Sequence, residues 1–212
     1  MNPLNYLKIK NKIPGNVKIL AVSKGFKSQE IKTIHDIGQN DFGESKFQEA
    51  FEKQLILKDL KRIDWHFIGR IQSNKIRKIV KNFKYIHSVD SFEKLQKISN
   101  ISCEERKNPF IMLQVKLSDD PTKGGFIPEL LILKWREIQE LKNIKLSGLM
   151  TINPKGLSSK DNSELFKKCR SLADSLQLPD CSMGMSGDWE EAVEAGSTWL
   201  RLGSLIFGER SY

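Results

Sequence analysis

Cysteine and histidine are scarce in this sequence, with three of each among 212 residues. The cysteines are far apart and form no CxxC pair, which argues against a disulfide framework or a zinc cluster and predicts reduced thiols. The histidines show no HxxxH or HExxH spacing. The sequence therefore predicts no metal site.

Long apolar runs are also missing. No segment approaches the roughly 20 apolar residues of a membrane helix, and the opening stretch MNPLNYLKIKNKIPG lacks the apolar core of a secretory signal. We therefore expect a cytoplasmic protein without a membrane partner. Hydrophobic residues make up 39% of the chain and charged residues 29%, which is typical of a globular domain.

Basic residues are in excess, and the net charge of +9 raises the question of a nucleic-acid partner. The densest basic segment, residues 70–84, has Ile76, Ile79 and Val80 on one helical face and lysines on another. No aromatic-rich or named nucleic-acid motif accompanies it. We interpret it as an amphipathic helix with a solvated basic face and expect no nucleic-acid partner.

Short strand-like runs alternate with amphipathic segments along the whole chain. The predicted strands are residues 17–23, 41–44, 65–69, 85–89, 110–117, 146–152, 181–185 and 199–202. The predicted helices are residues 30–37, 46–60, 74–82, 92–98, 128–141, 162–175 and 189–195. This alternation predicts an α/β fold, a (β/α)8 TIM barrel that spans residues 1–212 as a single domain. The alternative is an open doubly wound sheet, although no GxGxxG follows the first strand.

Several residues predict where these helices begin and end. Ser28 and Ser73 are candidate N-caps, and Asp90 with Glu93 forms a pattern like a capping box. Gly38 and Gly196 are candidate stop residues.

Lys24 follows the first predicted strand directly, in the stretch ILAVSKGF. The carboxyl ends of barrel strands form the functional face of this fold. Partial burial there lowers the pKa of a lysine and makes its neutral amine available as a nucleophile, as Schiff-base formation requires. The alternative is a solvated or ion-paired lysine at the start of a loop.

Glycine and serine follow strands seven and eight, at Ser186 and Gly187 and again at Gly203 and Ser204. Loops at these two positions often bind phosphate in barrels, through backbone amides and helix N-termini. The alternative is that these residues only turn and cap the chain. An amine that faces a phosphate site suggests an aldehyde that bears a phosphate, such as pyridoxal 5′-phosphate (PLP) or the substrate of a sugar-phosphate aldolase.

The stretch HFIGRIQSNK places Gln72, Ser73 and Asn74 directly after a buried strand. These polar residues could line a ligand site, or Ser73 could simply cap the next helix. For His66 we expect a hydrogen-bonded histidine of the core or rim.

Together these segments resemble a known family. AVSK, FGES, WHFIGRIQSNK, HSVD, LSGLM, SMGMSGDWEEAVEAGST and RLGSLIFGER occur here in the order typical of the YggS/PROSC family of pyridoxal phosphate-binding homeostasis proteins. The resemblance covers the chain from about Val17 to Tyr212. It implies a barrel similar to the N-terminal domain of alanine racemase, with PLP as cofactor.

The resemblance also implies roles for individual residues. The lysine that forms the Schiff base with PLP falls on Lys24. The phosphate contacts fall on Ser186, Gly187, Gly203 and Ser204. The arginine that faces the pyridine nitrogen falls on Arg201, and a protonated guanidinium there leaves the cofactor a weak electron sink.

Three departures from the family pattern affect these expectations. Ser45 replaces an asparagine after the second strand, which puts any contact of that side chain in doubt. The segment of residues 1–16 is short, so the helix before the first strand could be missing or reduced and one end of the barrel more open. Lys123 lies in DPTKGGF, where the family often has Lys-Ser-Gly, and a second cofactor contact there is an open alternative.

The resemblance implies a monomeric, non-catalytic carrier that binds and buffers PLP and delivers it, with apo PLP-dependent enzymes as possible recipients. The alternative is a PLP-dependent, racemase-like enzyme. Alanine racemases add a C-terminal β-domain and use a tyrosine of the partner subunit as second base, and we expect neither here. We accordingly predict cofactor-binding residues and no catalytic ones.

Overall fold

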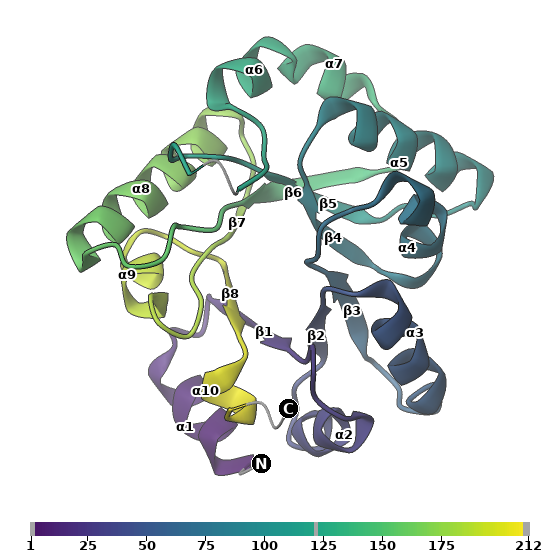
Figure 1. Cartoon of the computed structure of the whole chain (residues 1–212), viewed down its shortest axis with the longest axis vertical. Helices are drawn as coiled ribbons and strands as arrows, with labels where there is room; N and C mark the ends of the chain where they lie inside the picture. The colour runs from purple at the N-terminus through teal and green to yellow at the C-terminus, as the bar shows by residue number, and fades with distance from the viewer. Residues whose placement is uncertain (1–2, 121–122, 210–212) are drawn as a thin grey trace.

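Eight parallel strands close into a barrel in the order of the chain, because the first strand pairs with both the second and the last. The computed structural model describes residues 3–120 and 123–209 (Figure 1). The strands are β1 (Lys18–Val22), β2 (Asp41–Glu44), β3 (Asp64–Phe67), β4 (Tyr85–Val89), β5 (Phe110–Gln114), β6 (Lys145–Met150), β7 (Asp180–Ser182) and β8 (Trp199–Leu202). The predicted (β/α)8 barrel is confirmed, and each predicted strand overlaps an observed one.

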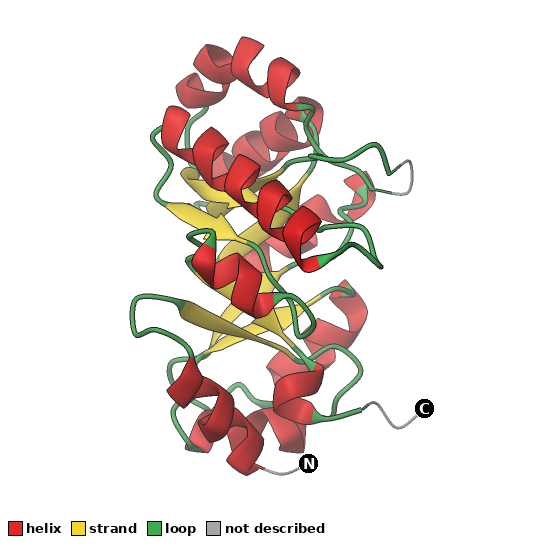
Figure 2. Ribbon diagram, turned by 90° about the vertical axis from the view of Figure 1, so that its left-hand side faces the viewer, coloured by secondary structure: helices red, strands yellow, loops and turns green. Residues whose placement is uncertain are grey.

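Helices surround the strands as an outer ring (Figures 1 and 2). They are α1 (Pro3–Lys12), α2 (Ser28–Asp36), α3 (Phe47–Ile56), α4 (Ile76–Asn82), α5 (Phe92–Glu104), α6 (Pro128–Leu133), α7 (Trp135–Glu140), α8 (Ser159–Ser175), α9 (Trp189–Glu194) and α10 (Ser204–Phe207), with a 3-10 turn η1 (Ser73–Lys75) before α4. Their apolar stripes cover the outward faces of the strands, as the 3.6-residue spacing of apolar residues predicts. In α4, for example, Ile76, Ile79 and Val80 are buried as predicted.

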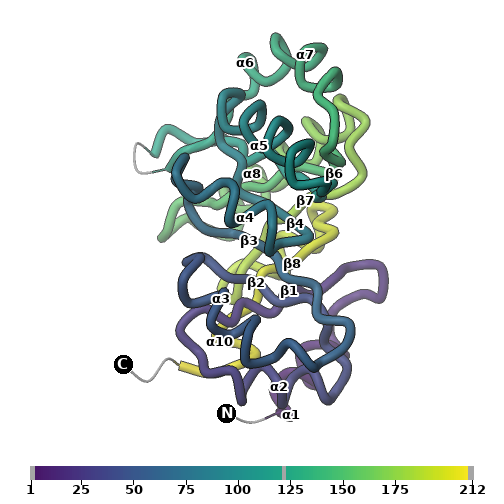
Figure 3. The backbone as a smooth tube through the Cα atoms, turned by 90° about the vertical axis from the view of Figure 1, so that its right-hand side faces the viewer, coloured from purple at the N-terminus to yellow at the C-terminus, as the bar shows by residue number. Residues whose placement is uncertain are grey.

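The segment before β1 is helical, so the alternative that no helix precedes the first strand is wrong. Helix α1 contributes Tyr6 and Ile9 to the core. The Tyr6 hydroxyl donates a hydrogen bond of 2.9 Å to Oε1 of Gln39, which lies just before β2. Helix α1 packs against the short α10 and against α2 (Figure 3). It therefore fills the place in the ring that the single turn of α10 leaves uncovered.

Aromatic and histidine side chains fill the barrel interior. Trp199 packs with Leu20, Met112 and Met150. The His66 imidazole lies flat against the Tyr85 ring, with centroids 4.2 Å apart and planes 4° apart. His66 is fully buried and hydrogen-bonded at both ring nitrogens, so its prediction as a core histidine is confirmed.

The helix boundaries correct several predictions. Ser28 is the first residue of α2 and Lys27 is its N-cap, with the Lys27 backbone N–H donating to the Glu30 carboxylate. Ser73 starts the 3-10 turn and makes no side-chain cap bond. Ser91 caps α5 in place of Asp90, whose carboxylate binds Lys94 instead.

The predicted helix of residues 128–141 is two helices that meet at Lys134. The chain turns there with φ near −89° and ψ near 0°, and the Lys134 N–H still bonds the carbonyl oxygen of Leu130. Both stop residues behave as predicted: Gly38 and Gly196 have positive φ, a conformation that glycine adopts without strain.

The loops that follow the strands project on one side of the barrel, to the right in Figure 2 and to the left in Figure 3. This is the face where the predicted site residues lie. Across residues 3–120 and 123–209, no helix combines the length and the apolar character of a membrane span.

Candidate functional site

One cavity at this face brings together all six predicted site residues. It has a volume of about 710 Å³, and its lining includes Lys24, Ser186, Gly187, Arg201, Gly203 and Ser204. Its apolar walls come from Val22, Phe26, Ile68, Ile152 and Met185. The convergence follows from the topology, because β1 and β8 are neighbours in the barrel and β7 lies next to β8. Residues that are distant in sequence therefore meet at one end of three adjacent strands.

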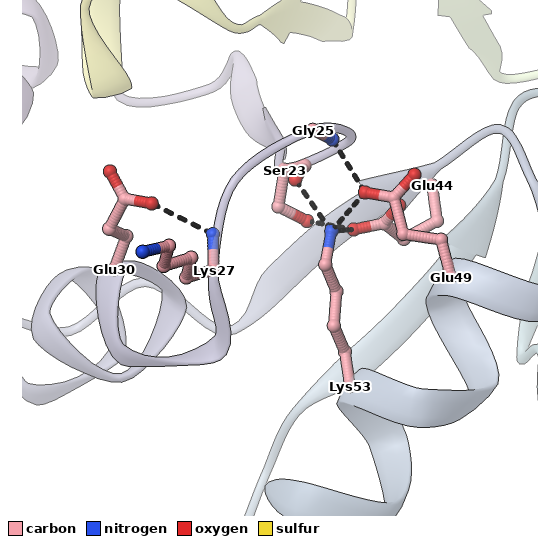
Figure 4. Close-up of polar contacts among 7 residues, drawn as sticks. All are labelled: Ser23, Gly25, Lys27, Glu30, Glu44, Glu49 and Lys53. Carbon is pink, nitrogen blue, oxygen red and sulfur yellow. Dashed lines mark hydrogen bonds and ion pairs between the residues drawn. The ribbon is translucent and has the colours of Figure 1, made fainter. Parts of the chain in front are cut away.

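Lys24 lies half-buried directly after β1, and hydrogen bonds from α3 fix both of its neighbours in the chain. The Lys53 ammonium donates to the Ser23 carbonyl oxygen at 2.8 Å. The Gly25 backbone N–H donates to the Glu49 carboxylate at 2.5 Å. Figure 4 shows these contacts converging around the Lys53 Nζ atom. The backbone on either side of Lys24 is therefore tied to a helix and cannot shift independently of it.

Lys53 is the centre of a buried ionic cluster, which we call the Lys53 cluster: Ser23, Glu44, Glu49 and Lys53. Its ammonium lies 2.7 Å from Oε1 of Glu44 and 2.6 Å from Oε1 of Glu49. The Ser23 hydroxyl donates to the same Glu44 oxygen at 2.7 Å. A buried charge is tolerated when it is paired and hydrogen-bonded in this way.

The two carboxylates of the cluster differ in pKa. Burial raises the pKa of Glu44, although Lys53 and the Ser23 hydroxyl oppose that rise. Burial also acts to raise the pKa of Glu49, but hydrogen bonds from Lys53 and the Gly25 amide outweigh it and lower the pKa. Lys53 thus pairs with two carboxyl groups, one of which lies at the end of β2.

Arg201 is 5% exposed and extends from β8 toward the cavity. Its Nη1 donates to the Ser182 carbonyl oxygen at 2.5 Å and to the Ser182 hydroxyl at 3.0 Å. Its Nη2 donates to the Thr151 carbonyl oxygen at 2.8 Å. Burial lowers the pKa of Arg201 to about 10, partly opposed by Asp188. The guanidinium therefore remains charged at neutral pH and is held in a fixed orientation.

The loops after β7 and β8 present backbone amides to the cavity. Within residues 3–120 and 123–209, the N–H groups of Ser186, Gly187, Ser204 and Leu205 donate to no other protein group. Ser186 and Ser204 also line this cavity, and each carries a hydroxyl. Amides and hydroxyls that are not used by the protein suit the oxygens of a phosphate. We call Ser186, Gly187, Gly203 and Ser204 the anion cradle.

Gly184 shapes the first half of the anion cradle. Its φ is +89°, and a Cβ atom at this position would lie 2.5 Å from the Ala192 Cβ and 2.8 Å from the Leu200 Cδ2. No other residue fits without displacing α9 or β8. This close packing turns the chain after β7 so that Ser186 and Gly187 reach the cavity.

Three residues singled out in the sequence lie outside this cavity. Lys123 lines a second, adjoining cavity together with Arg70 and Asp90. Ile68 and Ile152 line both this cavity and the first. Ser45 and Gln72 line a third cavity, between α3 and the turn η1. Ser45 also packs its backbone against Gly69, where a Cβ atom would lie 1.9 Å from the Ser45 carbonyl oxygen.

Sequence reasoning missed the residues that support the site. Ser182 accepts hydrogen bonds from Arg201. Lys53 and Glu49 bind Ser23 and Gly25, the two neighbours of Lys24 in the chain. Only the i,i+4 spacing of Glu49 and Lys53 was visible in the sequence, and that spacing is common on solvated helices.

A parallel barrel with a lysine at the end of β1 and an anion cradle after β7 and β8 defines a class of barrels that combine an amine with a phosphate site. The chain belongs to the family of the alanine racemase N-terminal domain, whose model matches residues 4–211. The resemblance inferred from the motifs is confirmed by curated relatives named pyridoxal phosphate homeostasis protein. That of Synechocystis sp. is 44% identical over 99% of both chains. That of Aquifex aeolicus is 38% identical over 92% of this chain and 88% of the relative.

Solved structures agree with this placement. PipY of Synechococcus elongatus without PLP superposes with a TM-score of 0.96 at 38% identity, over 98% of this chain and 100% of that one. PipY with PLP bound gives 0.94 at the same identity, over 97% and 99%. An alanine racemase of Clostridium difficile shares the fold at 18% identity with a TM-score of 0.83, over 99% of this chain and 56% of that chain.

Proposed function

We propose that this protein binds pyridoxal 5′-phosphate in the cavity at the end of β1, β7 and β8, and that it serves in PLP homeostasis by binding, buffering and delivering the cofactor. The observation that carries the proposal is the convergence of an amine, a fixed guanidinium and the anion cradle in one cavity of about 710 Å³. This donor set matches the aldehyde, ring nitrogen and phosphate of PLP. The names of the curated relatives and the PLP-bound form of PipY support it.

When bound, PLP supplies an aldehyde that forms a Schiff base with an amine. Lys24 supplies that amine, and the hydrogen bonds to Ser23 and Gly25 keep its backbone in place. The anion cradle binds the phosphate through backbone amides and the hydroxyls of Ser186 and Ser204. Arg201 would be the partner of the ring nitrogen, and its lasting positive charge would disfavour protonation of that nitrogen.

An unprotonated ring nitrogen suits storage of the cofactor, or mild racemase-like chemistry, more than demanding carbanion chemistry, because the electron-sink capacity of the cofactor depends on positive charge at that atom. The names of the curated relatives support storage. We therefore propose a carrier without catalytic turnover that acts as a monomer in the cytoplasm and passes PLP to apo PLP-dependent enzymes. Racemization of amino acids by the loaded protein would refute the carrier part of this proposal while leaving PLP binding intact.

The test is an absorbance titration with PLP followed by borohydride reduction and peptide mapping. We expect a visible Schiff-base band and a reduced adduct on Lys24 alone. The Lys24→Ala variant should lose the band and the adduct, whereas the matched control Lys27→Ala, an exposed lysine three residues on, should keep both. A wild-type protein that takes up no PLP would overturn the proposal.

A further inference from the structure

A chain of hydrogen bonds crosses the barrel interior from the cavity to the opposite end. Arg201 Nη1 lies 3.0 Å from the Ser182 Oγ, which lies 3.0 Å from the His87 Nδ1. The His87 Nε2 lies 2.9 Å from the His66 Nδ1, and the His66 Nε2 lies 3.0 Å from the Asp41 Oδ1. The chain thus connects β8, β7, β4, β3 and β2. Ser182, His66 and His87 are fully buried.

The chemistry of the side chains determines which group donates and which accepts in each of these hydrogen bonds. A guanidinium can only donate, so the Ser182 Oγ accepts from Arg201 and its own proton is available for His87 Nδ1. His87 then carries its proton on Nε2 and donates to the His66 Nδ1. His66 in turn donates from Nε2 to the Asp41 carboxylate. Every bond points from the cation at one end toward the anion at the other.

The surroundings of the two histidines keep them neutral and immobile. His66 packs against both the Tyr85 ring and the Trp199 ring, which also contact each other, and His87 contacts Trp199. Burial lowers the pKa of His66 to about 3 and the pKa of His87 well below its usual value. Neither ring can change its contacts by turning into solvent. The two possible arrangements of these hydrogen bonds therefore differ only in which nitrogen of each ring carries the proton.

Asp41 is the member of the chain that solvent can reach, with 28% of its side chain exposed. Burial raises its pKa to about 6, opposed by Lys18 of β1 and by Lys84, which precedes β4. The other groups that face it are the hydroxyls of Tyr6 and Tyr85 and the His66 imidazole, while Asp64 of β3 pairs with Lys84. Asp41 is thus the group in this chain of hydrogen bonds that gains or loses a proton near neutral pH.

Protonation of Asp41 allows the opposite direction. A protonated carboxyl can donate to the His66 Nε2 when the single proton of each histidine lies on Nδ1. In that arrangement His66 donates to His87 and His87 donates to the Ser182 Oγ. Each ring still holds one proton and Ser182 keeps its own, so the added proton is the one on Asp41. Ser182 then accepts from both His87 and Arg201, and its own buried proton loses its acceptor. Such an unsatisfied donor is costly and weakens the hold on the guanidinium.

We propose that His66 and His87 are positioning residues that orient the Ser182 hydroxyl and, through it, Arg201, and that the charge of Asp41 sets how firmly Arg201 is held as the partner of the cofactor ring. The proposal rests on the proposed function for its effect on PLP. The direction of the hydrogen bonds from Arg201 to Asp41 does not depend on whether the cofactor is bound.

The first experiment is therefore ¹⁵N NMR of the histidine rings in the cofactor-free protein. At about pH 7.5, where Asp41 is ionised, we expect both His66 and His87 as neutral Nε2–H tautomers. An Nδ1–H tautomer or an imidazolium at either residue would overturn the proposal. This result does not depend on PLP binding, so it separates failure of the proposal from failure of the proposed function.

The second experiment compares PLP dissociation rates in wild type and Asp41→Asn between about pH 7.5 and about pH 5. Asparagine keeps an oxygen acceptor for His66 but cannot ionise. We expect the ratio of the wild-type rate to the variant rate to rise several-fold as the pH falls. A ratio that stays constant would refute the link to Asp41, because pH effects on the phosphate and on Lys24 are common to both proteins.

Ser182→Ala tests the link to Arg201 with little disturbance of packing. It removes the hydroxyl but keeps the carbonyl contacts of Arg201. We expect several-fold faster PLP dissociation at all pH values and a loss of the pH-dependent ratio. The matched control is Ser147→Ala, which removes another buried hydroxyl, one that bonds the Ile111 carbonyl oxygen at 3.0 Å. Equal dissociation rates in the two variants would overturn the proposal.

Discussion

The Nζ atom of Lys53 lies 2.8 Å from the carbonyl oxygen of Ser23, the residue directly before Lys24. A lysine in the middle of α3 therefore helps to determine where Lys24, the proposed Schiff-base lysine, lies. The same ammonium pairs with a carboxylate at the end of β2. The position of Lys24 thus depends on β1, β2 and α3 together and not on its own loop alone.

Replacing Lys53 with methionine should destabilise the protein by about 3–5 kcal/mol, because it leaves the Glu44 carboxylate buried without its counterion. Urea denaturation at neutral pH measures the change. The exposed Lys58→Met is the matched control and should change stability little. Adding Glu44→Gln to Lys53→Met should restore part of the loss; a double variant with fully additive losses would show that the pair does not interact.

Stability should fall as the pH is lowered from about 7 to about 5. The folded pKa of His66 is about 3 and that of His87 is also depressed, so the unfolded chain binds two protons in this range that the folded chain does not. Asp41 opposes this with one proton, since its folded pKa is raised to about 6. Burial also raises the pKa of Glu44 and of Asp188, which act in the same sense as Asp41. The two histidines outweigh these carboxyl groups, because histidines of the unfolded chain take up their protons almost completely across this pH range, so the free energy of unfolding decreases with falling pH.

Asp41→Asn removes one of these opposing groups and should make this loss of stability steeper. Denaturation curves of wild type and variant at several pH values give both slopes. A shallower slope in the variant would contradict the assignment of the raised pKa to Asp41.

Gly184→Ala should destabilise the protein by about 2–6 kcal/mol, because alanine is strained at positive φ and its Cβ would collide with Ala192 and Leu200. Gly187→Ala is the matched comparison, since nothing lies within 4 Å of a Cβ there and its φ is not positive. We expect Gly187→Ala to fold with near wild-type stability. Thermal denaturation distinguishes the two, and equal losses would contradict the packing described around Gly184.

Ser204→Ala should weaken PLP retention about 10-fold, the effect of losing roughly one hydrogen bond to a charged group. Dissociation into an excess of an apo-enzyme acceptor gives the rate. Ser171→Ala, on the exposed face of α8, serves as the control. An unchanged rate for Ser204→Ala would remove its hydroxyl from the anion cradle.

The order of the strands and the strand-end positions of the site residues could be predicted from the sequence, because apolar runs that stop at a polar residue mark the ends of buried parallel strands. Lys24 and Ser204 were found in this way. Lys53 could not be found, since its burial arises only when α3 packs against β2 and the Ser23 loop. The break at Lys134 also left no signal, because the apolar spacing continues from Leu131 to Ile138 across it.

Local caps were predicted less well for a related reason. Asp90 has the right chemistry for a cap, but so does its neighbour Ser91, which makes the bond. Ser28 also has it, yet α2 begins one residue earlier than predicted from a Ser28 cap, with Lys27 as its N-cap. The sequence also could not predict which of His66 and His87 donates the hydrogen bond between them. That prediction requires knowing that β3, β4 and β7 bring the two rings and the Ser182 hydroxyl together inside the barrel.

The pairing of β1 with β8 has a consequence for the protein during its synthesis. Lys24 emerges from the ribosome early, whereas Arg201 and Ser204 belong to the last strand and the helix after it. The amine cannot meet its anion cradle until the barrel closes. If PLP binds in this cavity as proposed, a nascent chain cannot withdraw PLP from the cell through it, and the capacity to store the cofactor arises only with the closing of the final strand.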